Sequence, residues 1–489
     1  MQSFVTTLRD SELVGRRVVL LALLYLIPSF QAMLPIDDTD IWWRLRTGQW
    51  IIANHTVPVK DFISPDTTGK LWIEYGWSFQ ALVYALHARF GLLGLVYFIV
   101  AMSLIIAFVA HQLVRRAGLP FPFEVALVGL ALAAMKPLMT PRPWLFTIVF
   151  FSVELTIIAQ ARQSEKSRLL WFLPLLFFFW ANLHIQFIYG LAALGLLLAE
   201  VMVTSFWGWG GYQVAAPQLS FKPLLLVSLA CIGVTLATPY HLLLYKQIFE
   251  YAAEAGTFQY VTELHPMFFR SLDNWITLLL TLAAAFVLGW QRKWLPYATL
   301  LLLMGVFVAF RARRDVWVLV LVAIWIISDS FRSSFKEDSE RWSAWQIAVS
   351  AVVVACALYF VSLSRGISEE QLQIVVENKF PVRAVEYIKA NQLSGPLFND
   401  FTWGGFLSWS LREIPPSIDG RTNLYGDKAT ERSVITWEGR PGWDTNPELL
   451  RARLIVANRD APLTSLLRVH PRYKTIYQDD VAFVIIPIR

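Results

Sequence analysis

Charge and cysteine are both scarce in this sequence. Asp, Glu, Lys and Arg make up 16% of its 489 residues, against about a quarter in typical soluble domains, and 56% of the residues are hydrophobic. Apolar stretches recur along most of the chain, which argues against a soluble protein and indicates a polytopic membrane protein. The two cysteines, Cys231 and Cys356, lie inside apolar runs, so we expect no disulfide framework.

Several other sequence signals are missing. The first apolar run, Val18 to Leu34, has no clear small-residue cleavage site and is long enough to span a bilayer, so we predict no cleavable signal peptide. No short internal repeat or low-complexity tract appears. The net charge of +6 does not indicate a nucleic-acid partner, because Lys and Arg lie in short loops between apolar runs, where they set orientation.

The apolar runs predict about eleven transmembrane helices, since each approaches the roughly 20 residues that a spanning helix needs. They cover residues 16–34, 91–113, 122–136, 143–161, 168–183, 186–205, 222–239, 274–290, 294–311, 314–331 and 344–364. Prolines mark several of the junctions between them.

The basic residues favour one orientation of these helices. With a cytoplasmic N-terminus, the cytoplasmic loops hold Arg9, Arg16, Arg17, Arg115, Arg116, Arg162, Lys166, Arg168, Lys222, Arg292, Lys293, Arg332, Lys336 and Arg341. The short external loops hold half as many, namely Lys136, Arg142, Lys246, Arg270, Arg311, Arg313 and Arg314. This bias matches the positive-inside rule, and an odd number of helices then puts the C-terminus outside.

Two predicted external regions are long. One is the first loop, residues 35–90, and the other is the polar C-terminal stretch, residues 365–489. We therefore predict a transmembrane domain over 1–364, which includes the first loop, and a separate external α/β domain over 365–489. Helix-like spacing and strand-like runs support the second domain, at Val382, Val385, Ile388, Leu454–Val456 and Val481–Ile486.

Three carboxylates, Asp37, Asp38 and Asp40, follow directly after the first apolar run. Acids clustered at a membrane surface are costly unless they bind a metal, take a proton from a substrate or cap a helix. Ile41, Leu45, Gly48 and Ile52 then recur at spacings of 4, 3 and 4, with tryptophans beside them, which predicts an amphipathic helix in the interface. One acid, with Asp40 favoured, would be a general base for an acceptor hydroxyl or a metal ligand beside a phosphate. The alternative is that the acids only cap this helix.

Four arginines stand on the side of the membrane that the basic bias disfavours. Arg142 opens one span, and Arg311, Arg313 and Arg314 crowd the external end of another, beside Asp315. Arginine suits a phosphate-linked leaving group because its planar fork makes two hydrogen bonds. The alternative is interfacial snorkelling or pairing with nearby acids.

Further candidates occur in other external segments. Asn182 and His184 lie at a short turn between two spans, and Glu263 and His265 lie in a third external loop. His184 could act as a base or a hydrogen-bond donor, and Asn182, Glu263 and His265 could contact the substrate. His184, Glu263 and His265 could also complete a metal site with Asp40, with Mg²⁺ or Mn²⁺ as the ion, or these residues could be ordinary turn residues. Trp403, in Trp403-Gly404-Gly405, could stack on a sugar, or it could belong to a structural turn.

Motifs along nearly the whole chain carry a resemblance to known proteins. They are Asp40-Ile41-Trp42-Trp43-Arg44-Leu45-Arg46-Thr47-Gly48, Arg142-Pro143, Trp180-Ala181-Asn182-Leu183-His184, Thr238-Pro239-Tyr240, Arg311-Ala312-Arg313-Arg314, Asn399-Asp400-Phe401-Thr402-Trp403-Gly404-Gly405 and Ile418-Asp419-Gly420-Arg421. The chain resembles the GT-C superfamily of membrane glycosyltransferases and is similar to a group of bacterial polytopic proteins. It lacks the Trp-Trp-Asp-Tyr-Gly motif of oligosaccharyltransferases, which argues against en-bloc transfer to asparagine.

The resemblance implies a glycosyltransferase of a bacterial inner membrane, with an external (periplasmic) active site. It also implies a polyprenyl-phosphate-linked sugar as donor and a glycan, lipid or protein as acceptor. A transporter or flippase for a lipid-linked glycan is a different class, which would favour repeated halves and charges at the midplane. A non-catalytic assembly subunit is a third class.

Overall fold

The computed structural model of this chain describes residues 2–34, 36–164, 167–206, 214, 219–253, 259–332 and 344–488. The chain forms two compact units, each discontinuous in sequence. The first contains Met1–Leu34, Val96–Ala237 and Pro266–Gly366, and the second contains Pro35–Leu95, Thr238–His265 and Ile367–Arg489. The basic residues Lys166, Lys336 and Arg341, assigned above to cytoplasmic loops, lie outside the described residues.

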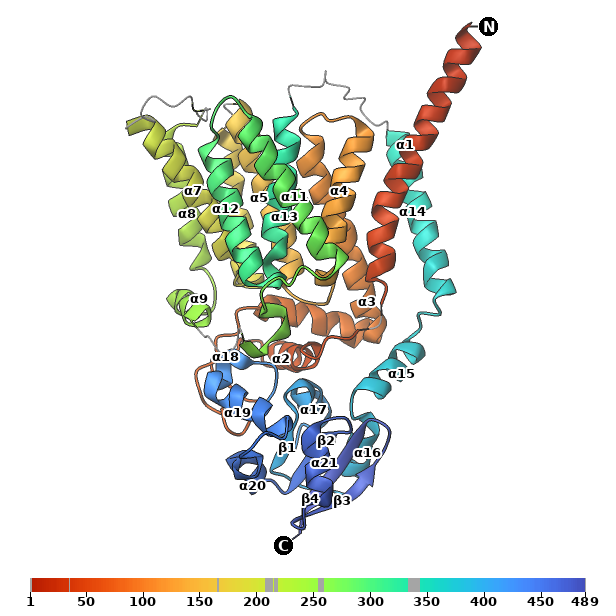
Figure 1. Cartoon of the computed structure of the whole chain (residues 1–489), viewed down its shortest axis with the longest axis vertical. Helices are drawn as coiled ribbons and strands as arrows, with labels where there is room; N and C mark the ends of the chain where they lie inside the picture. The colour runs from red at the N-terminus through yellow and green to blue at the C-terminus, as the bar shows by residue number, and fades with distance from the viewer. Residues whose placement is uncertain are drawn as a thin grey trace. The chain divides into compact units, whose positions relative to one another are not determined.

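Helices make up the first unit, and each predicted apolar run falls largely on one of them (Figure 1). They are α1 (Gln2–Ala32), the later part of α3 (Trp77–Arg115), α4 (Phe121–Met135), α5 (Trp144–Ser164), α6 (Leu173–Leu183) after a short 3₁₀ turn, α7 (Phe187–Phe206), α8 (Phe221–Thr235), α11 (Leu272–Trp290), α12 (Pro296–Arg311), α13 (Val316–Ser330) and α14 (Ala344–Ser364).

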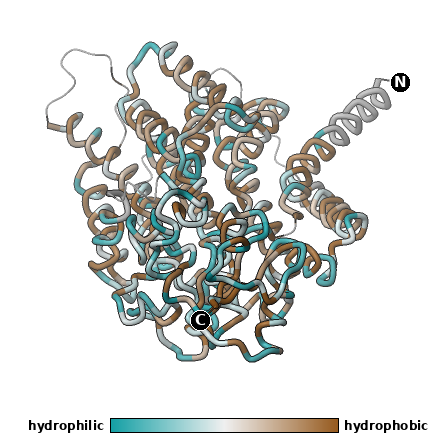
Figure 2. The backbone as a smooth tube through the Cα atoms, turned by 60° about the horizontal axis from the view of Figure 1, so that its bottom comes forward, coloured by the Kyte–Doolittle hydropathy of each residue, from teal (hydrophilic) through white to brown (hydrophobic). Residues whose placement is uncertain are grey.

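Six helical segments in the described residues are long and apolar enough to cross a membrane, and other apolar helices are shorter. Large hydrophobic side chains on them are exposed, among them Leu229 on α8, Phe286 on α11 and Phe360 on α14. Figure 2 shows these helices as mostly hydrophobic along their length. An outward-facing apolar surface of this kind needs lipid rather than water around it, so the fold is that of an integral membrane protein.

α3 bends sharply at Gly91, whose φ of 63° is outside helical geometry. The backbone N–H groups of Leu92 and Leu93 restart the helix after the bend, and both donate to the Glu369 carboxylate at 3.0 Å. A Cβ on Gly91 would lie 2.5 Å from the same carboxylate. Glycine is therefore required at this bend, and an acid from the C-terminal segment caps the helix that follows.

The second unit contains a four-stranded mixed sheet with the order β1-β2-β4-β3. β1 (Leu397–Asn399) is parallel to β2 (Leu454–Asn458), while β4 (Ala482–Pro487) is antiparallel to both β2 and β3 (Tyr473–Gln478). Its core includes Phe398, stacked on Trp437 with ring centroids 5.3 Å apart.

The remaining helices of this unit surround the sheet and the first loop. They are α2 (Ile41–Asn54), the start of α3, α9 (Leu242–Ala253), α15 (Glu369–Lys379), α16 (Val382–Ala390), α17 (Gly404–Ser410), α18 (Thr422–Tyr425), α19 (Asp427–Trp437), α20 (Pro447–Arg451) and α21 (Pro462–Val469). The predicted helix at Val382–Ile388 and the two predicted strands are confirmed as α16, β2 and β4, whereas β1 and β3 were not predicted.

Candidate functional site

The three clustered acids have different surroundings at the start of α2. Asp37 is exposed and forms an ion pair with Lys379, whose ammonium also donates to the Asp37 carbonyl at 2.9 Å. Asp38 is buried, and its Oδ1 accepts the backbone N–H of Asp40 at 2.8 Å. Asp40 occupies the N-cap position but its side chain makes no capping hydrogen bond to α2. The helix-capping alternative therefore does not account for the Asp40 carboxylate.

Glycines from two distant motifs approach the start of α2 closely. A Cβ on Gly420 would lie 2.0 Å from Oδ1 of Asp40, and a Cβ on Gly405 would lie 2.8 Å from the carbonyl oxygen of Thr39. Gly404 packs in the same way on the carbonyl oxygen of Ile418. These glycines therefore make room for protein backbone and for the Asp40 side chain. The position of Asp40 depends on residues about 380 positions later in the chain.

The tryptophans of α2 lie inside this unit. Trp42 and Trp43 are 4% and 6% exposed, and Trp42 packs edge-on against Phe380 and Phe406. Protein therefore covers these two side chains, and neither presents its ring to the surroundings of the molecule. Ile41, Leu45 and Gly48 are buried as the predicted stripe requires, whereas Ile52, its fourth member, is exposed. Contacts from the C-terminal segment, which the local spacing cannot show, cover the face where lipid was expected.

Trp403 is also buried, and its Nε1 donates to the carbonyl oxygen of Lys379 at 3.2 Å. This contact ties the Trp-Gly-Gly motif to the end of α15, the helix whose last residue also pairs with Asp37. The motif thus lies close to the acids, and a role in substrate binding for Trp403 remains a proposal.

A fully buried ion-pair network joins the first loop to the Asp-Gly-Arg motif. The Arg421 guanidinium donates to both carboxylate oxygens of Asp419, at 2.8 Å to 3.1 Å, and pairs closely with Asp61. Its Cζ also lies 4.6 Å from the ring centroid of Trp72. Burial alone would raise the pKa of Asp61, but Arg421 and hydrogen bonds from Thr67 and Ile63 hold that pKa below its ordinary value.

A second buried acid, Glu74, lies between α2 and α3. Its Oε1 accepts the N–H of Gly76 at 3.0 Å. Burial raises the pKa of Glu74, although the Arg44 guanidinium opposes the shift. Arg44 is 6% exposed and stacks on the Trp43 ring at 4.4 Å. An acid with a raised pKa beside a buried cation is a frequent property of functional sites, and here it lies in the same unit as Asp40.

In the first unit, the predicted site residues Asn182 and His184 lie at the turn between α6 and α7, close to the ends of two neighbouring helices. His184 Nδ1 lies 2.9 Å from the Thr147 hydroxyl, near the start of α5. Asn182 donates to the carbonyl oxygen of Ala237, just after α8, at 3.1 Å. These hydrogen bonds tie the α6–α7 turn to the ends of two neighbouring helices, so both side chains have structural partners.

The arginine-rich turn between α12 and α13 is connected through Asp315 to the turn between α6 and α7 and to the start of α7. Gln186 Nε2 and the Tyr189 hydroxyl donate to Asp315 at 2.6 Å and 2.7 Å. Arg314 lies 3.8 Å from this carboxylate, as the pairing alternative predicts, and Arg311 is exposed. Arg313 is half-buried, and its side chain makes no hydrogen bond or ion pair within the described part of the chain. At the start of α5, Arg142 stacks at 5.3 Å on Trp144.

The structure offers no ready-made metal site. No group of three or more His, Cys, Asp or Glu side chains among the described residues is placed to hold a metal ion. Glu263 lies in a short 3₁₀ turn of the second unit, and His265 Nε2 is 2.8 Å from the carbonyl oxygen of Gln259. In the part of the chain that the structure describes, Asp40, His184, Glu263 and His265 are therefore not brought together as one set of metal ligands.

Sequence reasoning did not select Asp61 or Glu74 as site residues. It did single out the Asp419-Gly420-Arg421 motif, as a possible part of an acceptor groove or as a structural turn. No local sequence pattern marks Asp61 or Glu74 as a site residue. The partner of Asp61 comes from a distant segment, and the cation beside Glu74 comes from α2. The available hint in the sequence is that these acids stand near prolines and tryptophans in the first loop.

Comparison with known proteins shows a similarity of fold and no similarity of sequence family. No protein-family model matches the sequence, and no curated protein matches it. Among solved structures, the chain is similar to the archaeal oligosaccharyltransferase AglB from Archaeoglobus fulgidus, in complex with an inhibitory peptide and a dolichol-phosphate. The TM-score is 0.54 at 11% identity, over 92% of this chain and 70% of AglB. This similarity shows that the chain shares the overall fold of AglB and does not by itself show an activity.

Proposed function

We propose that this protein is a membrane glycosyltransferase that uses a polyprenyl-phosphate-linked sugar and acts at the external face of a bacterial inner membrane. The observation that carries the proposal is Asp40. It stands at the N-cap position of α2, and Gly420 from a distant motif leaves room for its carboxylate. The AglB-like fold supports it, because AglB was solved with a dolichol-phosphate, a lipid of the proposed donor class.

In the proposed reaction, Asp40 acts as the general base. The acceptor hydroxyl gives its proton to the Asp40 carboxylate while its oxygen bonds to the anomeric carbon of the sugar. The bond between that carbon and the phosphate oxygen breaks, and its electron pair leaves with the polyprenyl phosphate. Asp38 holds the turn before α2, and Asp37 and His184 are the further candidates for assisting proton transfer. No step of the proposed reaction is assigned to a metal ion.

The arginines are proposed to hold the donor phosphate. Negative charge grows on the bridging oxygen as the sugar leaves, so a fixed cation lowers the barrier. Arg313 is the first choice, since Arg314 pairs with Asp315, and Arg142 and Arg311 are the further proposed contacts to the phosphate. Asn182, Glu263, His265 and Trp403 remain proposed substrate contacts. The acceptor would be a glycan, lipid or protein hydroxyl.

The proposal also includes a topology of about eleven spans, with the N-terminus cytoplasmic and residues 365–489 outside. Its support is the basic-residue bias and the helices that coincide with the predicted runs. A reporter enzyme fused after the last residue should be active only on the external side. Cytoplasmic reporter activity would place Asp40 in the wrong compartment for this function.

The test of the proposed chemistry compares two acids of the same unit. Purified wild-type, Asp40→Asn and Asp460→Asn proteins would receive a labelled polyprenyl-phosphate sugar with a panel of glycan, lipid and protein acceptors. Asp460 is exposed and serves as the matched control. We expect turnover to fall by about 10²–10⁴ for Asp40→Asn and to be unchanged for Asp460→Asn. Near wild-type turnover of Asp40→Asn would remove Asp40 from the mechanism.

A further inference from the structure

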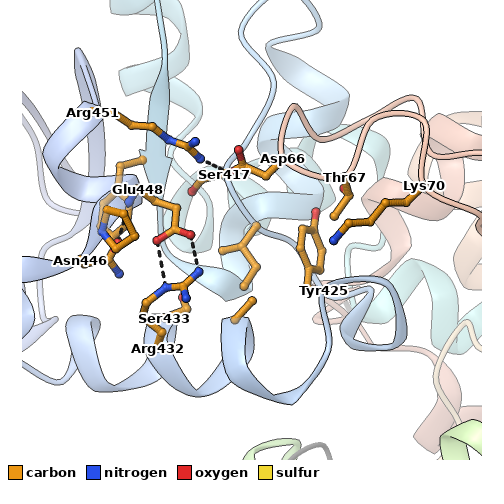
Figure 3. Close-up of a pocket in the computed structure, with 14 residues that line it drawn as sticks. Asp66, Thr67, Lys70, Ser417, Tyr425, Arg432, Ser433, Asn446, Glu448 and Arg451 are labelled. Atoms are coloured by element: carbon orange, nitrogen blue, oxygen red, sulfur yellow. Dashed lines mark hydrogen bonds and ion pairs between the residues drawn. The ribbon is translucent and has the colours of Figure 1, made fainter.

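A cavity of about 310 Å³ lies within the second unit (Figure 3). The three acids at the start of α2 are not among the residues that line it. Residues 66–70 of the first loop, helices α19 and α20 and the end of β1 line it. Phe398, Ile418, Ala429 and the ring of Tyr425 supply the apolar part of the wall. This volume is at the small end of ligand pockets, so the cavity suits a ligand of about one ring.

Two ion pairs line the polar side of the cavity. Arg432 binds Glu448 through two hydrogen bonds, one of 3.1 Å, and Arg451 pairs with Asp66. A guanidinium has five donors and a carboxylate about four acceptor positions, so each pair keeps unused donors beside unused acceptors. A simple anion would meet two carboxylates here and a simple cation two guanidinium groups. Hydroxyl groups, which both donate and accept, match this lining.

Ser433 supplies an independent indication of a ligand. It is 6% exposed and lines the cavity, and its Oγ has no hydrogen-bond partner in the described structure. Leaving a buried hydroxyl without a partner is unfavourable, because the group has lost its hydrogen bonds to water and gained none in return. A ligand hydroxyl in the cavity would provide the missing partner.

Lys70 sets the charge that the ligand should carry. Three cations line the cavity, Lys70, Arg432 and Arg451, against two carboxylates, Asp66 and Glu448, which leaves one positive charge. The arginines are paired, whereas the exposed Lys70 ammonium has no ion-pair partner among the described residues. In Figure 3 its amine lies beside the Tyr425 ring at the edge of the cavity.

We propose that this cavity binds one acidic sugar residue, a hydroxylated ring that carries a single carboxylate. The hydroxyls would meet the two ion pairs and Ser433, one face of the ring would lie against Tyr425, and the carboxylate would pair with Lys70. Such a site would hold part of a glycan. Binding needs neither donor nor Asp40, so its failure would leave the transferase proposal standing, and its success would not establish that proposal.

The test uses D-glucuronate and D-glucose, which differ only at the carboxylate, with saturation-transfer NMR titrations of the full-length protein in detergent. Wild type should bind glucuronate more tightly than glucose, and inorganic phosphate should not displace it. Lys70→Met should weaken glucuronate binding about fivefold, the upper range for an exposed ion pair, without changing glucose binding. Lys60→Met, an exposed lysine of the same loop outside the cavity, is the matched control and should change neither.

Two further variants test the cavity itself. Glu448→Gln should weaken both sugars, whereas Glu438→Gln, in an exposed ion pair outside the cavity, should not. Ala429→Trp should abolish binding by filling the space. Equal binding of glucuronate and glucose, binding that survives Ala429→Trp, or absence of binding by either sugar would overturn the proposal.

Discussion

Arg421 gives the sharpest quantitative prediction, because it is a single buried cation between two buried carboxylates. Its side chain is 1% exposed, and those of Asp61 and Asp419 are fully buried. Arg421→Met keeps most of the stem volume but leaves both acids without a cation. Breaking a buried ion pair from one side costs about 3–5 kcal/mol. Local unfolding that separates the first loop from the Asp-Gly-Arg motif should therefore occur far more often.

Hydrogen exchange read by mass spectrometry measures this opening directly. Since 1.36 kcal/mol is a factor of ten, amides in peptides around Asp61 and Arg421 should exchange roughly 150- to 5,000-fold faster in Arg421→Met. Arg459→Met breaks an exposed pair with Asp480 in the same unit and should change exchange by about fivefold at most. Equal effects of the two substitutions would refute the reasoning.

The pH dependence of the same opening has a predicted sign. In the wild type the pKa of Asp61 is below its ordinary value, so its stabilisation is complete above the unfolded-state pKa and is lost as the pH falls through the folded-state pKa. In Arg421→Met burial, the largest influence on this pKa, raises it against only the hydrogen bonds from Thr67 and Ile63. Protonation then favours the folded state, and protection should increase as the pH falls. Parallel pH curves for the two proteins would contradict this account.

Three further substitutions test other parts of the account. Gly420→Ala places a Cβ 2.0 Å from Asp40 Oδ1 and should lower turnover at least tenfold in a transfer assay, whereas Gly129→Ala, with open space around it, should not. Arg313→Lys keeps the charge but loses the two-pronged geometry, so donor affinity measured by titration should fall several-fold. Burial raises the pKa of Glu74, so stability from this residue is lost as the pH rises through that pKa; Glu74→Gln should flatten this part of a thermal-unfolding pH profile.

Local pattern predicted the elements of this fold well. Each apolar run became a helix, and the spacing of Val382, Val385 and Ile388 predicted α16, because these signals depend only on neighbours along the chain. β1 was missed, since three residues carry too little alternation to be recognised. Whether all eleven helices cross the membrane stays a prediction, as does the boundary at residue 365.

The sequence predicted individual residues of the candidate site, but it did not predict which of them lie in contact. The sequence singled out Asp40 and Asp419-Gly420-Arg421 separately, but nothing in either segment indicates that Gly420 meets Asp40. Likewise the partner of Arg421 is an acid 360 residues earlier. Such contacts are decided by tertiary packing, which composition and spacing do not encode. The burial of Trp42 and Trp43 shows the same limit, since Trp42 is covered by Phe380 and Phe406, and Trp43 packs with Trp72 and Leu424.

The central claim is that the protein breaks the bond between sugar and polyprenyl phosphate and passes the sugar to an acceptor. The most direct measurement is the mass balance of all lipids and glycans after wild-type protein in liposomes has met the labelled donor and the acceptor panel. The account predicts that free polyprenyl phosphate and sugar-bearing acceptor appear in equal amounts. Intact donor recovered from the opposite leaflet, with no free polyprenyl phosphate, would show a lipid-linked glycan transporter and contradict it.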